Sequence, residues 1–207
     1  NREFKLIYKL FIDKTSFLLN SIGVNINTMP VLDLRSKSSS NVIGDRSFSN
    51  NPKIVSKIGD LCIKFFHQNG IGTVIKHIPG HGCSSLDSHK KLPIVNLSFQ
   101  NLNDTDFFPF KNSHSKFAMT AHILYKKLDK YNVATFSKKI IQKIIRKKLG
   151  FKGILISDDI SMKALKYDLI TNAKKALAAG CNIVLYCGGK HKETYKLIKE
   201  VPQIDKF

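Results

Sequence analysis

Short apolar runs alternate with segments of helical periodicity along the whole chain, and this alternation limits the folds that it can adopt. Five runs predict strands: GVNINTMPVLDL, GTVIKHI, KFAMTAHILY, GILISDD and CNIVLYC. Residues 3–22 place apolar side chains at helical spacing, and a second helix is expected from Pro52 to the Asn69-Gly70 pair. Strands that alternate with helices predict a parallel sheet, either in a (β/α) barrel or in an open doubly wound fold.

Further helices are expected between the later strands. Residues 99–114 are predicted to be helical, and Ser137 can cap KKIIQKIIRKKL, which Gly150 closes. The segments NAKKALAAG and KETYKLIKEV complete the pattern. Because no linker, repeat or low-complexity segment interrupts it, we expect residues 1–207 to form a single domain.

Four of the five predicted strands end in ionisable residues. These are Asp33, Lys76-His77, His122 and Asp158-Asp159. Burying such groups without partners is costly, so their repeated placement at one end of successive strands indicates a shared site. All strand ends converge on the active site of a (β/α) barrel, whereas only those beside the switch point meet in an open sheet. The distribution therefore favours the barrel.

The net charge of +19 is large for 207 residues. A charge of this size attracts nucleic acid, membrane surfaces or acidic substrates. The lysines are scattered from Lys5 to Lys206, and no basic patch is interleaved with aromatic residues. We therefore favour compositional drift over nucleic-acid binding.

Location follows from three observations on the sequence. No apolar run approaches the roughly 18 residues of a membrane span, and the N-terminal segment lacks the apolar core of a signal peptide. The four cysteines form no C-x-x-C pair, and without a secretory signal reduced thiols are the default. The sequence thus predicts a cytoplasmic protein with no membrane partner.

The segment KHIPGHGCSSLDSHKK follows the second predicted strand and allows three interpretations. His77, His81, Asp87 and His89 are metal-ligand types, but their H-x3-H-x5-D-x-H spacing matches no compact zinc pattern. For His81, which glycines flank, bonding to the loop backbone is the favoured role. Asp87 and His89 stand two residues apart, so an extended loop places both on one side. A carboxylate beside an imidazole favours a proton donor that works near neutral pH.

The run GILISDD supplies a second carboxylate. Asp158 fits a nucleophile or a base at the strand end, whereas Asp159 fits the N-cap of a following helix. Glycoside cleavage with retained configuration needs a nucleophile on one face of the sugar and an acid/base beside the leaving oxygen. A strand-end carboxylate and an Asp-backed histidine are such a pair.

Four ordered motifs resemble glycoside hydrolase family 3, in its bacterial β-N-acetylglucosaminidase branch. KHIPGHGCSSLDSHKKLP is similar to the KHFPGHG…DSH…LP loop of that family, and GFKGILISDDISMKAL is similar to its nucleophile segment. PVLDL…NVIGDRSFS and MTAHILYKKLD match in the same order, so the resemblance covers residues 20–190. It implies a TIM barrel without a metal or an organic cofactor.

The resemblance also implies roles for individual residues. Asp158 corresponds to the nucleophile, His89 to the acid/base and Asp87 to its partner. The contacts to the hydroxyls of N-acetylglucosamine would come from Arg46, Lys76 and His77. The implied partner is a small carbohydrate, GlcNAc-1,6-anhydro-MurNAc and its peptides, from which cytoplasmic enzymes of cell-wall recycling remove the non-reducing GlcNAc.

The chain departs from this family at its start. The family barrel has eight strands and an early DQEGG…R segment that binds the sugar, whereas this sequence has five predicted strands and lacks that segment. We expect an N-terminally truncated chain that holds the C-terminal portion of the barrel. Two alternatives to a hydrolase stay open: an inactive remnant, and a GlcNAc phosphorylase, because histidine tolerates an incoming phosphate better than a carboxylate does.

Overall fold

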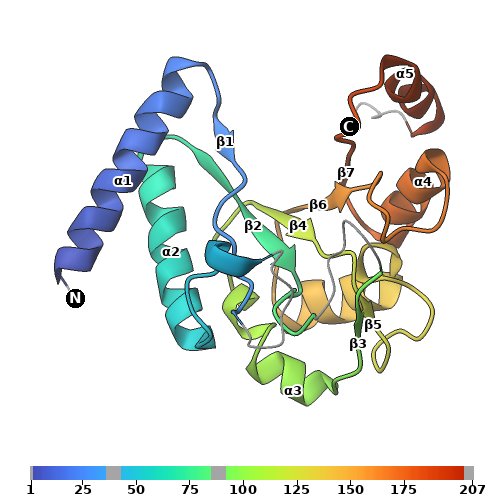
Figure 1. The fold of residues 1–207 in the computed structure, drawn as a ribbon, viewed down its shortest axis with the longest axis horizontal. Helices are drawn as coiled ribbons and strands as arrows, with labels where there is room; N and C mark the ends of the chain where they lie inside the picture. Colours follow the sequence, from blue (N-terminus) through green and yellow to red (C-terminus); the bar gives the residue numbers. More distant parts are fainter. Residues whose placement is uncertain (1, 36–42, 85–91, 203–207) are drawn as a thin grey trace.

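A five-stranded parallel sheet forms the middle of the molecule (Figure 1). The computed structural model describes residues 2–35, 43–84 and 92–202. The strands pair in chain order, each with the next, whereas the order in a doubly wound sheet reverses at a switch point. The predicted barrel-type sheet is thus confirmed. Its strands are β1 (Ile26–Asn27), β2 (Gly72–Ile78), β4 (Phe117–Thr120), β6 (Ile154–Asp159) and β7 (Ile183–Leu185).

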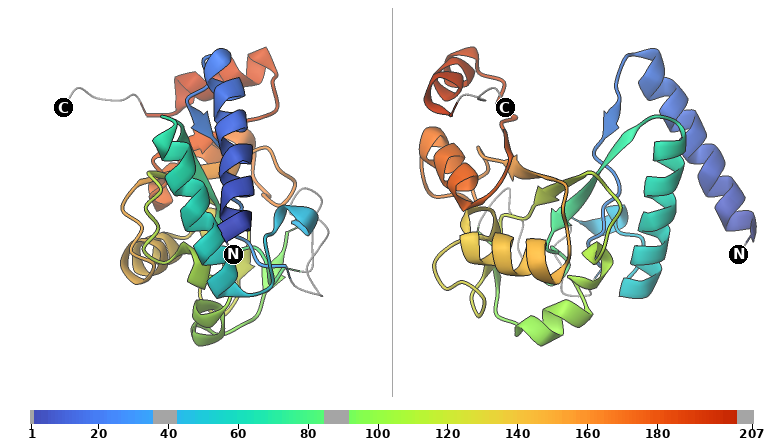
Figure 2. Two further views of the ribbon diagram at one scale, coloured as in Figure 1. Left: turned by 90° about the vertical axis from the view of Figure 1, so that its left-hand side faces the viewer. Right: turned by 180° about the vertical axis from the view of Figure 1, so that it is seen from behind.

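Helices connect the strands and flank the sheet. Figure 2 shows α1 beside α2 at one end of the sheet and α4 beside α5 at the other. The α-helices are α1 (Arg2–Ser21), α2 (Pro52–Gln68), α3 (Phe99–Asp104), α4 (Leu169–Ala179) and α5 (His191–Glu200). The other helical segments are the 3-10 turns η1 (Gly44–Arg46), η2 (Phe108–Phe110) and η3 (Ala134–Phe136), and the π-helix η4 (Ile140–Lys148).

Several helices begin and end at local capping residues. The Asn51 side chain accepts hydrogen bonds from the N–H groups of Lys53 and Ile54, at 3.0 and 3.4 Å. Ser137 Oγ accepts the N–H of the residue three positions later at 3.1 Å, which starts η4. Gly180, with φ of 117°, ends α4 in the left-handed conformation that glycine adopts without steric cost. These bounds confirm the helices expected from Pro52, after Ser137 and at NAKKALAAG.

The helix expected over residues 99–114 is wrong. α3 ends at Asp104, and the chain then forms the short turn η2. Pro109 lies inside that turn, where its missing N–H does no harm. A buried Phe107 and Phe110 on either side of Pro109 anchor the turn in the core, so tertiary packing overrides the helical pattern.

Two of the predicted strands are broken. β1 stops at Asn27, and the chain meets β2 again only at the bridge between Val31 and Lys76. Pro30 lies in the gap and has no N–H to continue the ladder. The run KFAMTAHILY divides into β4 and β5 (Leu124–Tyr125), and β5 joins β3 (Ile94–Val95) in a separate two-stranded sheet.

The largest hydrophobic core lies between the sheet and the helices. η4 and the residue that follows it contribute to it the buried residues Ile140, Ile141, Ile144, Ile145 and Leu149. The strands contribute Ile75 and Ile78 from β2, Ala118 from β4 and Leu155 from β6. This packing fixes the strands against their helices, so the positions of the strand ends are set by the core.

The sheet is open. Within the described residues β1 and β7 are its two edges, where a closed barrel would join them. Beside β1, α1 packs Ile12 into a small core with Phe66 of α2 and leaves Leu10 and Phe17 exposed on its other face. In the described part of the chain, no helix has the length and apolar character to cross a membrane.

Candidate active site

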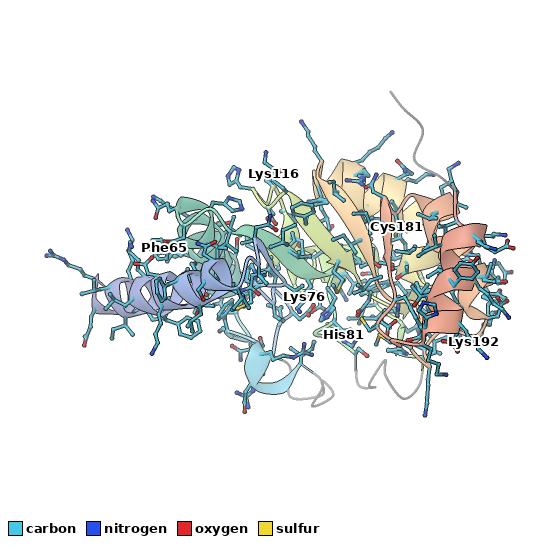
Figure 3. The ribbon with its side chains drawn as sticks, turned by 90° about the horizontal axis from the view of Figure 1, so that it is seen from above. Phe65, Lys76, His81, Lys116, Cys181 and Lys192 are labelled. Atoms are coloured by element: carbon cyan, nitrogen blue, oxygen red, sulfur yellow. The ribbon has the colours of Figure 1, made fainter. Side chains whose placement is uncertain are left out.

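The ionisable residues at the strand ends gather on one side of the sheet. Lys76 and His77 lie near the carboxyl end of β2. His122 follows β4, and Asp158 is the second-last residue of β6. Figure 3 shows Lys76 and His81 on the other side of the molecule from Lys116, which immediately precedes β4. The predicted convergence of these strand ends therefore occurs.

Asp33 and His77 form the buried centre of this group. The Asp33 side chain is fully buried, and its Oδ2 lies 2.7 Å from His77 Nδ1. The backbone N–H groups of His77 and His81 also donate to Asp33, at 3.1 and 2.8 Å. Burial raises the pKa of Asp33, but the charge and hydrogen bonds of His77 outweigh it, so the pKa ends below its ordinary value. Asp33 is therefore an ionised carboxylate inside the protein.

Asp158 lies on the other side of the His77 ring. Its Oδ2 is 3.9 Å from His77 Nε2, so the imidazole stands between two carboxylates. Asp158 Oδ1 accepts the backbone N–H of Asp159 at 2.8 Å, which holds the carboxylate at the strand end. The side chain keeps 17% of its surface exposed, whereas Asp33 keeps none. Of these two carboxylates, only Asp158 is accessible to a ligand.

Lys76 brings positive charge close to Asp158, and Arg46 lies within electrostatic range of Lys76. Burial lowers the pKa of Lys76, and Arg46 lowers it further, while Asp158 and Asp33 act in the opposite direction. The ammonium group is thus within electrostatic range of both carboxylates. Arg46 comes from η1 and is exposed. The accessible carboxylate therefore has Lys76 and His77 beside it, an arrangement that suits a ligand rich in hydroxyl groups.

His122 fixes the backbone beside Asp158. Its Nε2 lies 3.0 Å from the carbonyl oxygen of Asp159, and its Nδ1 lies 2.7 Å from Thr135 Oγ1. Because the carbonyl can only accept, Nε2 carries the proton and the threonine hydroxyl donates to Nδ1. Burial lowers the pKa of His122, which keeps the ring neutral. His122 was marked by its place at a strand end, and its contacts are those of a supporting residue.

The helix N-cap expected at Asp159 is wrong. Its carboxylate accepts the N–H and the hydroxyl of Ser161, at 3.0 and 2.7 Å, and the N–H of Cys187 at 3.1 Å. A turn follows it, and the next helix, α4, is capped by Asp168. Asp159 therefore links the end of β6 to the segment after β7. Its side chain stabilises a turn and does not cap a helix.

His81 is a buried loop residue. Its N–H donates to Asp33, and its ring packs edge-on against His77 with 5.8 Å between the ring centroids. Burial lowers the pKa of His81. In residues 2–35, 43–84 and 92–202, no three His, Cys, Asp or Glu side chains are placed to hold a metal ion. Asp87 and His89, the other residues of the metal interpretation and of the predicted dyad, lie outside the described residues.

Asp106 is a second buried carboxylate, which the sequence pattern did not single out. It is 1% exposed, and its Oδ2 accepts the N–H of Cys83 at 2.8 Å. A Cβ atom at Gly80 or Gly82 would lie within 2.7 Å of an Asp106 atom, so the turn needs glycine at both positions. Burial raises the pKa of Asp106 from its ordinary value of 3.8 to about 6. Asp106 therefore packs against the turn after β2 and stabilises it through the hydrogen bond from Cys83.

This burial gives a prediction about stability. A raised pKa in the folded state means that the contribution of Asp106 is complete below about pH 4 and is lost as the pH rises through about 6. We expect Asp106→Asn to raise the free energy of unfolding at neutral pH by on the order of 1–3 kcal/mol, less what the altered hydrogen bond costs. Urea unfolding at acidic and neutral pH measures the difference.

The matched control is Asp104→Asn, two residues earlier in an exposed position. Its effect should stay within about 0.5 kcal/mol, as is usual for surface substitutions. An Asp106→Asn effect of the same size at both pH values would contradict the assignment of Asp106 as a buried carboxyl with a raised pKa.

Comparisons with known proteins agree with this architecture. Residues 14–205 match the glycosyl hydrolase family 3 N terminal domain. A β-hexosaminidase of Nitrosomonas eutropha is 38% identical over 174 residues, which are 82% of this chain and 49% of that protein. A β-hexosaminidase of Tolumonas auensis is 38% identical over 81% of this chain and 51% of its own length. The chain thus spans about half the length of these relatives.

Solved structures show the same fold. NagZ from Neisseria gonorrhoeae, in complex with N-trifluoroacetyl-D-glucosamine, superimposes with a TM-score of 0.82 at 32% identity, over 92% of this chain and 55% of that one. Zn-bound CbsA from Thermotoga neapolitana gives 0.82 at 34% identity, over 94% of this chain and 44% of that one. The open sheet is an incomplete barrel of the TIM type, and the chain belongs to glycosyl hydrolase family 3.

Proposed function

We propose that this chain carries the catalytic residues of a retaining β-N-acetylhexosaminidase, which hydrolyses terminal non-reducing β-N-acetylglucosamine. The observation that carries the proposal is the accessible Asp158 carboxylate at the end of β6, with His77 Nε2 at 3.9 Å and Lys76 within electrostatic range. The relatives named β-hexosaminidase support the choice of sugar. Residues 1–207 are proposed to act as one catalytic unit.

Asp158 is proposed to be the nucleophile. Retention of configuration proceeds through a covalent glycosyl-enzyme, which needs an ionised carboxylate at the anomeric carbon. His77 faces one oxygen of Asp158, and the Asp159 N–H holds the other. This leaves the carboxylate fixed in place but exposed on the ligand side, which lowers the entropic cost of attack.

The second catalytic group is proposed to be His89, with Asp87 as its partner. In the sequence, both follow the turn after β2 by a few residues. His89 would protonate the leaving oxygen and then take a proton from water. Lys76, His77 and Arg46 are proposed to form hydrogen bonds with the sugar hydroxyls, which can both donate and accept.

The natural substrate is proposed to be GlcNAc-1,6-anhydro-MurNAc and its peptides, handled in the cytoplasm during cell-wall recycling. Muropeptides carry carboxylates, and the net charge of +19 favours association with an anionic ligand. The prediction of a cytoplasmic location rests on the four cysteines of the sequence, all of them free. Neither a metal nor an organic cofactor takes part in the proposed reaction.

Product analysis tests the reaction type. An aryl β-N-acetylglucosaminide should release GlcNAc of β configuration in phosphate-free buffer, and adding inorganic phosphate should leave the product unchanged. Formation of GlcNAc-1-phosphate, with little turnover in its absence, would instead identify a phosphorylase. Inverted α-GlcNAc as the first product would exclude the covalent mechanism.

A second candidate is a sugar-binding remnant without turnover, and the open sheet is the observation that favours it. Within the described residues β1 and β7 have no further strand beside them, and the chain spans about half of its relatives. Calorimetric titration with GlcNAc separates the candidates. Binding without release of aglycone identifies the remnant, whereas turnover by the same preparation excludes it.

A further inference from the structure

The Asp33 side chain accepts hydrogen bonds from the segment that carries His77. The His77 N–H, the His77 ring and the His81 N–H all donate to it, from a stretch 44 to 48 residues away in sequence. Asp33 itself is fully buried and touches no solvent. A carboxylate that accepts three hydrogen bonds from this turn is placed to control the turn and the imidazole.

The geometry at the ring selects one tautomer of His77. A carboxylate can only accept, so the 2.7 Å contact requires a proton on His77 Nδ1. The opposite nitrogen, Nε2, then faces Asp158 at 3.9 Å. With its proton on Nδ1, the ring presents the Nε2 edge to the site, and its orientation is fixed from behind.

We propose that Asp33 is a positioning residue of this enzyme, which fixes the tautomer and orientation of His77 so that its Nε2 edge serves Asp158 and the bound sugar. The proposal rests on the proposed function of the site. Asp33 touches neither the reacting atoms nor the ligand side, because it is enclosed by the turn. Its effect on the reaction is transmitted through the imidazole.

A neutral amide at this position would fail in a defined way. The backbone N–H groups of His77 and His81 cannot change, so the oxygen of an asparagine must stay where Asp33 Oδ1 accepts them, at 3.2 and 2.8 Å. Its NH2 group then faces His77 Nδ1 and donates to it. The ring proton must then move to Nε2, so the edge that faces Asp158 changes from an acceptor to a donor.

Other titratable groups also surround His77. His81 lies edge-on at 5.8 Å, Lys76 precedes it in the chain, and Asp158 faces Nε2. His122 also interacts electrostatically with His77, and burial keeps its own ring neutral by lowering its pKa. Of these groups, only Asp33 is in hydrogen-bond contact with the ring, so its removal should change the tautomer most.

Nitrogen-15 spectra of the histidine side chains of the whole protein test this directly. The wild type should show His77 with a proton on Nδ1, and Asp33→Asn should move that proton to Nε2. With an aryl β-N-acetylglucosaminide, kcat should fall by roughly 10- to 100-fold, the range for residues that orient a histidine from behind. Asp104→Asn, an exposed carboxyl without a bond to His77, is the control and should keep both the tautomer and kcat.

A double-mutant cycle separates positioning from a structural effect. If Asp33 acts through the imidazole, adding Asp33→Asn to His77→Ala should cost little more than His77→Ala alone. Multiplicative losses, an unchanged His77 tautomer in Asp33→Asn, or a kcat equal to that of Asp104→Asn would each overturn the proposal. If the wild type releases no aglycone, the proposed function fails, and the Asp33 proposal is decided by the spectra alone.

Discussion

Asp158→Ala is expected to lower kcat/KM for aryl β-N-acetylglucosaminides by on the order of 10⁴-fold or more, the scale seen when a residue of a covalent mechanism is removed. The glycosyl-enzyme cannot form without this carboxylate. Initial-rate kinetics at saturating and low substrate measure the loss. The fold should survive, because the Asp158 side chain is partly exposed.

The neighbouring carboxylate provides the matched control. Asp159→Asn keeps an oxygen that can accept from the N–H groups of Ser161 and Cys187, so most activity should remain. Azide offers a second check, because it can occupy the space left in Asp158→Ala and attack the anomeric carbon in place of the carboxylate. A glycosyl azide of α configuration is expected. Equal losses from both substitutions would assign the two residues one structural role.

The second large effect concerns protonation of the leaving group. His89→Ala should lower the rate of glycosylation by about 10²- to 10⁴-fold for substrates with poor leaving groups. Activated aryl glycosides should lose less in this step, since their aglycones depart without a proton. A Brønsted plot of rate against leaving-group pKa measures the change, which should appear as a steeper slope in the variant.

Asp87 should act together with His89. In Asp87→Ala the imidazole remains but loses the carboxylate that favours its protonated form, so the alkaline limb of the pH–rate profile should move to lower pH. The double variant should be little worse than His89→Ala, because the residues of a coupled unit are not additive. Multiplicative losses with an unmoved alkaline limb would show that Asp87 has only a structural role.

Helices with local signals could be read from the sequence. α2 starts at an Asn-Pro pair and stops at Asn-Gly, and α4 ends at a glycine with positive φ. Failures occurred where long-range pairing decides the outcome. The run after Lys116 divides because Leu124 and Tyr125 pair with β3, about 30 residues earlier in the chain. Periodicity within the run carries no information on that partner.

The candidate site shows the same difference between what local sequence signals predict and what long-range contacts decide. The strand-end rule located Lys76, His77, His122 and Asp158, because the carboxyl ends of parallel strands must meet. The rule also marked Asp33. Its contact with His77 joins residues 44 positions apart in the sequence, so the contact could not be predicted without the folded turn.

Asp106 shows where sequence information runs out. NLNDTDFF contains an exposed Asp104 and a buried Asp106 two residues apart in the same polar stretch. No pattern in that stretch distinguishes the two, so only the folded chain identifies the carboxyl that supports the turn.

The central claim is that Asp158 attacks the anomeric carbon of a β-linked N-acetylglucosamine. The direct measurement is trapping with a fluorinated GlcNAc analogue that forms its glycosyl-enzyme quickly and hydrolyses slowly, followed by mass spectrometry of the peptides. We predict one sugar per chain, attached to Asp158 in the peptide from GILISDD, and no label in Asp158→Ala. Label on Asp159, or on any residue other than Asp158, would contradict the account.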